Sequence, residues 1–248
     1  MKQTRDIMGM PVSIEVRDEG DPHQAIEKVF DYFRLVDERF STYKHDSEIS
    51  RFNRGEISHG DLSDDMREVF ALAEEEKGKT RGYFDIKKPD GSIDPSGIVK
   101  GWAIKKAAEI LRGSGCKYFY IDAGGDIQAS APEGSAPWKV GIRSPFKREE
   151  IVKSINITDG GVATSGTYIR GQHIYDPHNP GQEIRDVVSI TVVADDIYKA
   201  DIAATAAFAM GMRGIEFVSN MPGYEAYQID ANGKALMTKG FSKYVQKD

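Results

Sequence analysis

Residues 200–211 restrict the fold of this chain more than any other segment, because they are alanine-rich and apolar on almost every side. A helix that is apolar all round must be covered by other elements. Asp201 and Thr205 are four residues apart and so share one face of this helix. A carboxylate buried there is costly unless a cation or several donors satisfy it, and its pairing with a hydroxyl suits a hard cation such as Mg²⁺. The alternative is that Asp201 caps the helix and Thr205 bonds back to a carbonyl.

The rest of the chain changes between helical and strand periodicity. Asp21 is expected to cap the first helix with Pro22 at its first position, and Asn232-Gly233 predicts a two-residue hairpin turn. Helices flanking mostly hairpin-linked strands favour an α+β fold, and no linker-like stretch divides the chain, so we expect one domain over residues 1–248. The patterns predict helices over residues 22–40, 63–80, 95–112, 196–210 and 212–220, and strands over 7–17, 118–121, 138–142, 151–157, 187–193, 224–229 and 235–238.

Composition excludes several classes of protein. The 248 residues are 40% hydrophobic, which is enough to form a core without disulfide bonds or structural metal ions. A net charge of -6 argues against broad nucleic-acid binding. Cys116 is the single cysteine, so no internal disulfide can form, and no Cys/His cluster suggests zinc. No run approaches the roughly 20 apolar residues of a membrane helix. The first residues lack the apolar core of a signal peptide, which predicts a cytoplasmic location.

Two further segments could carry chemistry. In residues 94–103, glycines and free N–H groups at a helix start could receive phosphate, and Lys100 adds a cation one turn in. An ordinary helix capped by Asp94 or Ser96 is the alternative, since no P-loop or dinucleotide-binding pattern is present. In residues 160–177, a strand rich in glycine and hydroxyls leads to His173, which could act as a general base near neutral pH or could be structural.

These segments belong to an ordered series of motifs. The series consists of Met8-Gly9-Met10-Pro11, residues 41–53, Tyr83-Phe84-Asp85, residues 94–103, Asp122-Ala123-Gly124-Gly125-Asp126, Ala163-Thr164-Ser165-Gly166, residues 173–177 and residues 200–211. In this order the motifs resemble the ApbE family of FAD:protein FMN transferases, from about residue 8 to residue 211 and more weakly beyond. The resemblance implies an α+β fold of mixed or antiparallel sheets flanked by helices, with two lobes around a flavin-binding cleft.

The resemblance also implies roles for individual residues. His173 matches the catalytic histidine of the family. The positions that match metal ligands are Asp201, Thr205 and the backbone carbonyl of Gly97. The positions that match contacts to FAD are Met8, Tyr43, Asp85, Asp94, Lys100 and Tyr175.

The implied reaction is Mg²⁺-dependent transfer of FMN from FAD onto a Ser or Thr of an acceptor flavoprotein, with release of AMP. The acceptor would carry the motif Asp-Gly/Ser-x-x-Ser/Thr-x-Ala/Thr. The nearest matches in this chain, at Asp90-Gly91 and Asp159-Gly160, lack the acceptor hydroxyl, so the acceptor is expected to be another protein. Many relatives are exported lipoproteins. Two alternatives stay open: hydrolysis of FAD to FMN and AMP, and flavin binding without catalysis.

Overall fold

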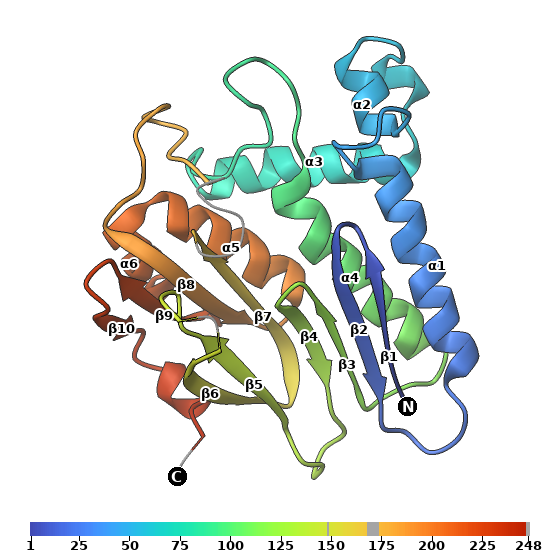
Figure 1. Cartoon of the computed structure of the whole chain (residues 1–248), viewed down its shortest axis with the longest axis vertical. Helices are drawn as coiled ribbons and strands as arrows, with labels where there is room; N and C mark the ends of the chain where they lie inside the picture. The colour runs from blue at the N-terminus through green and yellow to red at the C-terminus, as the bar shows by residue number, and fades with distance from the viewer. Residues whose placement is uncertain (148, 168–173, 247–248) are drawn as a thin grey trace.

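The centre of the computed structural model, which describes residues 1–147, 149–167 and 174–246, is an eight-stranded antiparallel sheet (Figure 1). Its strand order is β1-β2-β3-β4-β7-β8-β9-β10. Consecutive strands pair antiparallel in β1–β2, β3–β4, β7–β8 and β9–β10, whereas the β2–β3 and β8–β9 pairs join strands separated by helices. The strands are β1 (Lys2–Ile7), β2 (Met10–Val16), β3 (Phe119–Ala123), β4 (Asp126–Ser130), β7 (Asp159–Gly166), β8 (Val187–Ala194), β9 (Glu225–Asp230) and β10 (Ala235–Met237).

Helices cover one face of this sheet. Figure 1 shows α5 lying across β7 and β8, and α4 beside it behind β3 and β4, with α1 packed on the outside of α4. The helices are α1 (His23–Phe40), α2 (Glu48–Asn53), α3 (Asp64–Lys79), α4 (Ser96–Gly113), α5 (Ile197–Ala209) and α6 (Gly214–Ser219), with 3-10 turns at His59–Asp61, Gly211–Arg213 and Phe241–Lys243. Among the described residues, no helix has both the length and the apolar character needed to cross a bilayer.

A two-stranded ribbon, β5 (Trp138–Arg143) with β6 (Ile151–Ile157), covers the other face. The alternation of side chains along the strands shows this division. Ala163 and Val192 belong to the larger core beneath the helices, whereas their chain neighbours Val162 and Val193 belong to the smaller core beneath the ribbon. The α+β class, with antiparallel sheets flanked by helices, is therefore confirmed, while the division into two lobes around a cleft stays a prediction.

The alanine-rich helix is buried, as its composition predicted. In α5, Ala200, Ile202 and Ala204 are all 3% exposed or less. The helix begins after Asp196, whose side chain accepts a hydrogen bond from the Lys199 amide at 3.0 Å. Asp201 lies inside the helix and is not its cap, so the capping alternative for Asp201 is wrong.

Several predicted boundaries are also wrong. The predicted strand over 7–17 is in fact the second strand of a hairpin, because Met8 and Gly9 take positive φ values (57° and 71°) and turn the chain between β1 and β2. Strand β4 was not predicted, since it directly follows the Gly124-Gly125 turn and is only five residues long. The cap of α1 is Pro22 rather than Asp21, although Asp21 still accepts a hydrogen bond from the His23 amide at 3.0 Å.

The hairpin at Asn232-Gly233 forms, but its turn is longer than the predicted two residues. Ala235 pairs with Ile229, and the Asp230 amide donates to the Lys234 carbonyl at 3.0 Å. This leaves residues 231–233 in the loop, where Gly233 takes a positive φ of 81°. A three-residue loop with glycine in the left-handed region is a common alternative to the two-residue turn.

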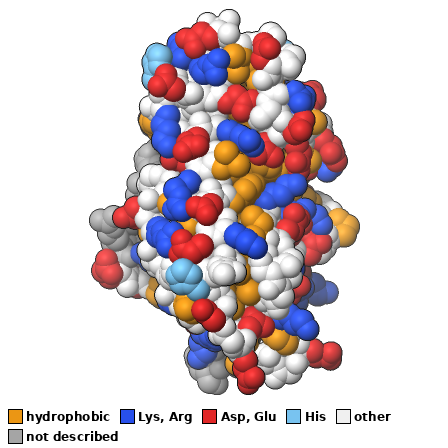
Figure 2. Space-filling model, turned by 90° about the vertical axis from the view of Figure 1, so that its right-hand side faces the viewer, with side chains coloured by type: hydrophobic (Ala, Val, Ile, Leu, Met, Phe, Trp, Pro, Cys, Tyr) orange, Lys and Arg blue, Asp and Glu red, His pale blue; other side chains and the backbone are white. Residues whose placement is uncertain are grey.

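The surface that carries α1 has no continuous patch of one charge. Figure 2 shows acidic and basic side chains alternating over this face, with apolar side chains between them. Ion pairs join Arg39 to Asp65 and Arg5 to Glu27. This face therefore offers no basic track for a phosphate backbone.

Candidate functional site

Helices α4 and α5 approach closely where two glycines face two oxygen-bearing side chains. A Cβ atom placed on Gly101 would lie 2.8 Å from Cβ of Asp201, and one placed on Gly97 would lie 3.8 Å from Cγ2 of Thr205. The Gly101 amide donates a hydrogen bond of 2.9 Å to Oδ2 of Asp201. The three residues predicted to hold a metal, Gly97, Asp201 and Thr205, are thus brought together.

Strand β7 adds a second hydroxyl to this place. Ser165 is 7% exposed, and its Oγ lies 3.5 Å from Oγ1 of Thr205. Within the described part of the chain, no group of three or more His, Cys, Asp or Glu side chains could hold a metal. A cation here would instead be held by one carboxylate, hydroxyl and carbonyl oxygens, and oxygens of its ligand. This oxygen-only donor set fits Mg²⁺, which often shares its coordination with substrate phosphates.

A cation and a second buried carboxylate lie next to the same crossing. Lys100 of α4 forms an ion pair with Oδ2 of Asp126, at the start of β4. Oδ1 of Asp126 accepts a hydrogen bond of 3.1 Å from the Thr164 amide of β7. Thr164 and Ser165 are adjacent, so Asp126 connects the lysine of α4 to the strand that approaches Thr205.

The connection between α3 and α4 holds two more of the predicted residues, Asp85 and Asp94, and Tyr175 lies close to them. Asp85 forms an ion pair of 2.8 Å with Lys77, and Asp94 one of 2.9 Å with Lys88. Burial opposes ionisation of Asp94, but hydrogen bonds from Lys88 and Ser96 outweigh it, so its pKa is below the usual value. Burial, followed by the charge of Asp85, raises the pKa of Tyr175, and Lys88 opposes this shift. The hydroxyl of Tyr175 is therefore near enough to Asp85, Lys88 and Asp94 for their charges to act on it.

The remaining predicted residues come from other segments of the chain. Met8 lies in the β1–β2 turn and packs, partly buried, against the larger core. Tyr43, between α1 and α2, is 98% exposed. The predicted catalytic residue, His173, lies outside the described residues.

The segment after residue 173 is tied to the end of α3. Nε2 of His178 lies 2.9 Å from the carbonyl oxygen of Arg81, and its ring packs edge-on against Tyr83, with centroids 4.5 Å apart. The hydroxyl of Tyr83 accepts a hydrogen bond of 2.7 Å from Arg213. We call these three side chains, His178, Tyr83 and Arg213, the clasp.

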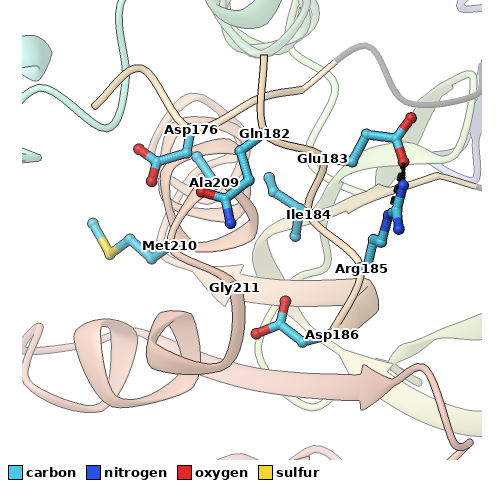
Figure 3. Close-up of a pocket in the computed structure, with 9 residues that line it drawn as sticks. All are labelled: Asp176, Gln182, Glu183, Ile184, Arg185, Asp186, Ala209, Met210 and Gly211. Atoms are coloured by element: carbon cyan, nitrogen blue, oxygen red, sulfur yellow. Dashed lines mark hydrogen bonds and ion pairs between the residues drawn. The ribbon is translucent and has the colours of Figure 1, made fainter. Parts of the chain in front are cut away.

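A shallow pocket of about 360 Å³ opens at the carboxyl end of α5. Figure 3 shows that residues 182–186 line one wall, where Glu183 and Arg185 pair with each other. Ala209, which also lines the pocket, is one helical turn beyond Thr205. The pocket lies on the same helix as the oxygen cluster, but Asp201 and Thr205 are not among its lining residues.

Two residues of the site were missed by sequence reasoning. Asp126 and Ser165 both fall in the recognised motifs, yet neither was assigned a role. An acid that directly follows a Gly-Gly turn and opens an apolar strand is a detectable signal of a buried carboxylate, and it would have found Asp126. Ser165 is one of several hydroxyls in its segment, so only the contact with Thr205 distinguishes it.

The fold and the site define an α+β protein with an oxygen-lined cluster between two helices. The model of the ApbE family matches residues 8–88 and 86–228, and the chain belongs to this family.

Several curated relatives share the name FAD:protein FMN transferase. The protein of Escherichia coli (strain K12) is 26% identical over 166 residues, which cover 63% of this chain and 47% of the relative. The protein of Haemophilus influenzae is 24% identical over 309 aligned positions, which cover 96% of this chain and 88% of the relative. The chain thus spans about half the length of the first of these curated relatives and most of the second.

Solved structures share the fold over the whole chain. The ApbE protein of Thermotoga maritima has a TM-score of 0.85 at 22% identity and covers 100% of this chain and 99% of its own. The flavin transferase ApbE of Vibrio cholerae has a TM-score of 0.84 at 23% identity, with 98% of each chain covered.

Proposed function

We propose that this protein is a Mg²⁺-dependent FAD:protein FMN transferase that modifies a Ser or Thr hydroxyl of an acceptor flavoprotein. The observation that carries the proposal is the α4–α5 crossing, where Asp201 and Thr205 face Gly97 and Gly101, one turn apart. The names of the curated relatives support the same activity. The proposal includes residues 1–248 acting as one ApbE-like domain and working in the cytoplasm.

The oxygen cluster would hold the metal and the phosphates. Asp201, Thr205 and the Gly97 carbonyl would bind Mg²⁺, which would neutralise charge on the FAD pyrophosphate. Lys100, at the start of α4, would add a positive charge to the same phosphates. The remaining flavin contacts are assigned to Met8, Tyr43, Asp85, Asp94 and Tyr175.

The chemical step needs a base and an in-line attack. His173 would accept the proton of the acceptor hydroxyl, and that oxygen would attack the phosphorus on the FMN side of the pyrophosphate. The bond from this phosphorus to the bridging oxygen breaks, AMP leaves with that oxygen, and a phosphoester joins FMN to the acceptor. The atoms balance without a further co-reactant.

The test combines the protein with FAD, Mg²⁺ and a domain that carries the acceptor motif. We expect the acceptor to gain the mass of FMN while AMP is released, and an acceptor whose target Ser or Thr is replaced by Ala should gain nothing. Release of AMP from FAD without labelling would identify a hydrolase instead. Bound FAD that stays intact would identify a flavin-binding protein, and either result would contradict the proposal.

A further inference from the structure

Among the described residues, Asp126 and Asp201 are the two buried acidic side chains, 2% and 5% exposed. The proposed reaction uses Asp201 but assigns nothing to Asp126. A buried carboxylate loses favourable hydration, and its partners must offset that cost. The partners of Asp126 therefore indicate what it does.

The two oxygens of Asp126 have separate partners. Oδ1 accepts the hydrogen bond from the Thr164 amide and so extends the β4–β7 pairing by one side-chain contact. Oδ2 pairs with the ammonium of Lys100, whose side chain is 19% exposed. The first contact needs only a hydrogen-bond acceptor. The second uses the negative charge, and its partner is the cation assigned to the pyrophosphate.

The geometry points to Asp126 as a positioning residue that directs the Lys100 ammonium toward the phosphates, an inference that rests on the proposed function. Lys100 extends from α4 on a flexible stem with several rotamers. Because Asp126 follows the Gly124-Gly125 turn and is bonded to β7, it is a rigid anchor for that stem. The same β7 segment holds Ser165 against Thr205. The Asp126 carboxylate therefore fixes the position of the Lys100 ammonium relative to the proposed metal ligands.

The variant that separates the two contacts is Asp126→Asn. Its amide oxygen can still accept from the Thr164 amide, so the fold should be kept, but the negative charge that pairs with the Lys100 ammonium is lost. FAD should bind no more weakly than to the unmodified protein, because a carboxylate that competes with the phosphates for the ammonium has been removed. Turnover should fall on the order of tenfold to a hundredfold, because the lysine is no longer held in place. Loss of a merely structural residue would instead weaken binding and turnover together and lower the melting temperature.

The matched control is Asp196→Asn. Asp196 also lies between α4 and α5, where its Oδ2 is 3.6 Å from Nζ of Lys105. Asparagine is as good a helix cap as aspartate, so this variant removes a carboxylate from the same pair of helices without changing the cap. Its turnover should equal that of the unmodified protein.

A double-mutant cycle with Lys100→Met decides whether Asp126 acts through the lysine. Affinity for FAD is measured by flavin fluorescence without Mg²⁺, and turnover as AMP release with it. In the Lys100→Met background, Asp126→Asn should change neither the affinity for FAD nor the turnover any further. The single variant Asp126→Glu, which keeps the negative charge, should have a higher turnover than Asp126→Asn. Equal effects of Asp126→Asn in both backgrounds would overturn the positioning role while leaving the proposed function intact. Failure of the unmodified protein to bind FAD would overturn both.

Discussion

The backbone amide of Gly101 on α4 donates a 2.9 Å hydrogen bond to the buried carboxylate of Asp201 on α5. This contact provides one donor for a charge that would otherwise be costly inside an alanine-rich helix. It depends on glycine, because an added Cβ would lie 2.8 Å from Cβ of Asp201 and 3.1 Å from the carbonyl oxygen of Ile197. The close helix crossing and the position of the carboxylate are therefore one structural feature.

Replacing Gly101 by Ala should push α4 and α5 apart. We expect a loss of roughly 1–3 kcal/mol in the free energy of unfolding, typical of overpacking, together with a loss of the proposed transferase activity. Urea unfolding measures the first and AMP release the second. The control is Gly78→Ala in α3, where nothing lies within 4 Å of the added Cβ. That variant should be more stable by about 0.5–1 kcal/mol, since alanine is the better helix former.

Replacing Asp201 by Asn should weaken metal binding without breaking the helix contact. The amide oxygen can still accept from Gly101, so the melting temperature without metal should change little. The Mg²⁺ concentration that gives half-maximal activity should rise roughly tenfold or more, because ligand changes at metal sites commonly have at least this effect. An unchanged Mg²⁺ titration would exclude Asp201 as a ligand.

The Lys88–Asp94 pair should make stability depend on pH in the acid range. The pKa of Asp94 is below its ordinary 3.8, so the pair stabilises the fold above about that pH, and this contribution is lost as the pH falls through the lowered pKa. At pH 7, Asp94→Asn should be less stable by about 0.5–1 kcal/mol, a modest value because the lysine is partly exposed. At a pH below the pKa of Asp94 in both the folded and the unfolded protein, Asp94→Asn and the unmodified protein should unfold at the same urea concentration. Lys88→Met should reproduce the loss at pH 7.

Removing the ring of His178 should loosen the segment held by the clasp. In His178→Ala, the contacts with the Arg81 carbonyl and the Tyr83 ring are lost, so local opening of residues 174–186 should become easier. Trypsin should then cleave after Arg185 faster in the variant, while the global melting temperature changes little. His45→Ala is the control, because that exposed ring is paired with its neighbour Asp46. Equal cleavage rates in all three proteins would show that the clasp does not hold this segment.

Replacing His173 by Ala should separate binding from chemistry. FAD should still bind, while transfer of FMN to the acceptor should fall by about 10²–10⁴-fold, the usual contribution of a general base. Fluorescence titration and the mass of the acceptor measure the two effects. Undiminished flavinylation would remove His173 from the mechanism.

Much of the fold could be predicted from local patterns. The stripe of α1 and the apolar run of α5 each follow from the spacing of their own side chains, and both helices form where expected. The errors occur at turns and helix ends, where the conformation of single residues sets the boundary of an element. Met8 takes a positive φ although it is not glycine, so the β1–β2 turn has no strong sequence signal. The N-cap of α1 is Pro22, one residue after the predicted Asp21, and local sequence patterns do not resolve a helix boundary to one residue.

Helical spacing and composition are enough to show that Asp201 and Thr205 share one face of a buried helix. What that face contacts depends on how the helices and strands pack in three dimensions. Gly97 and Gly101 are about a hundred positions away along the chain. Helix packing sets which of their atoms approach Asp201. The pairing of Lys100 with Asp126 likewise depends on how α4 lies against the β3–β4 hairpin, and no local pattern encodes the distance between two elements joined by long-range packing.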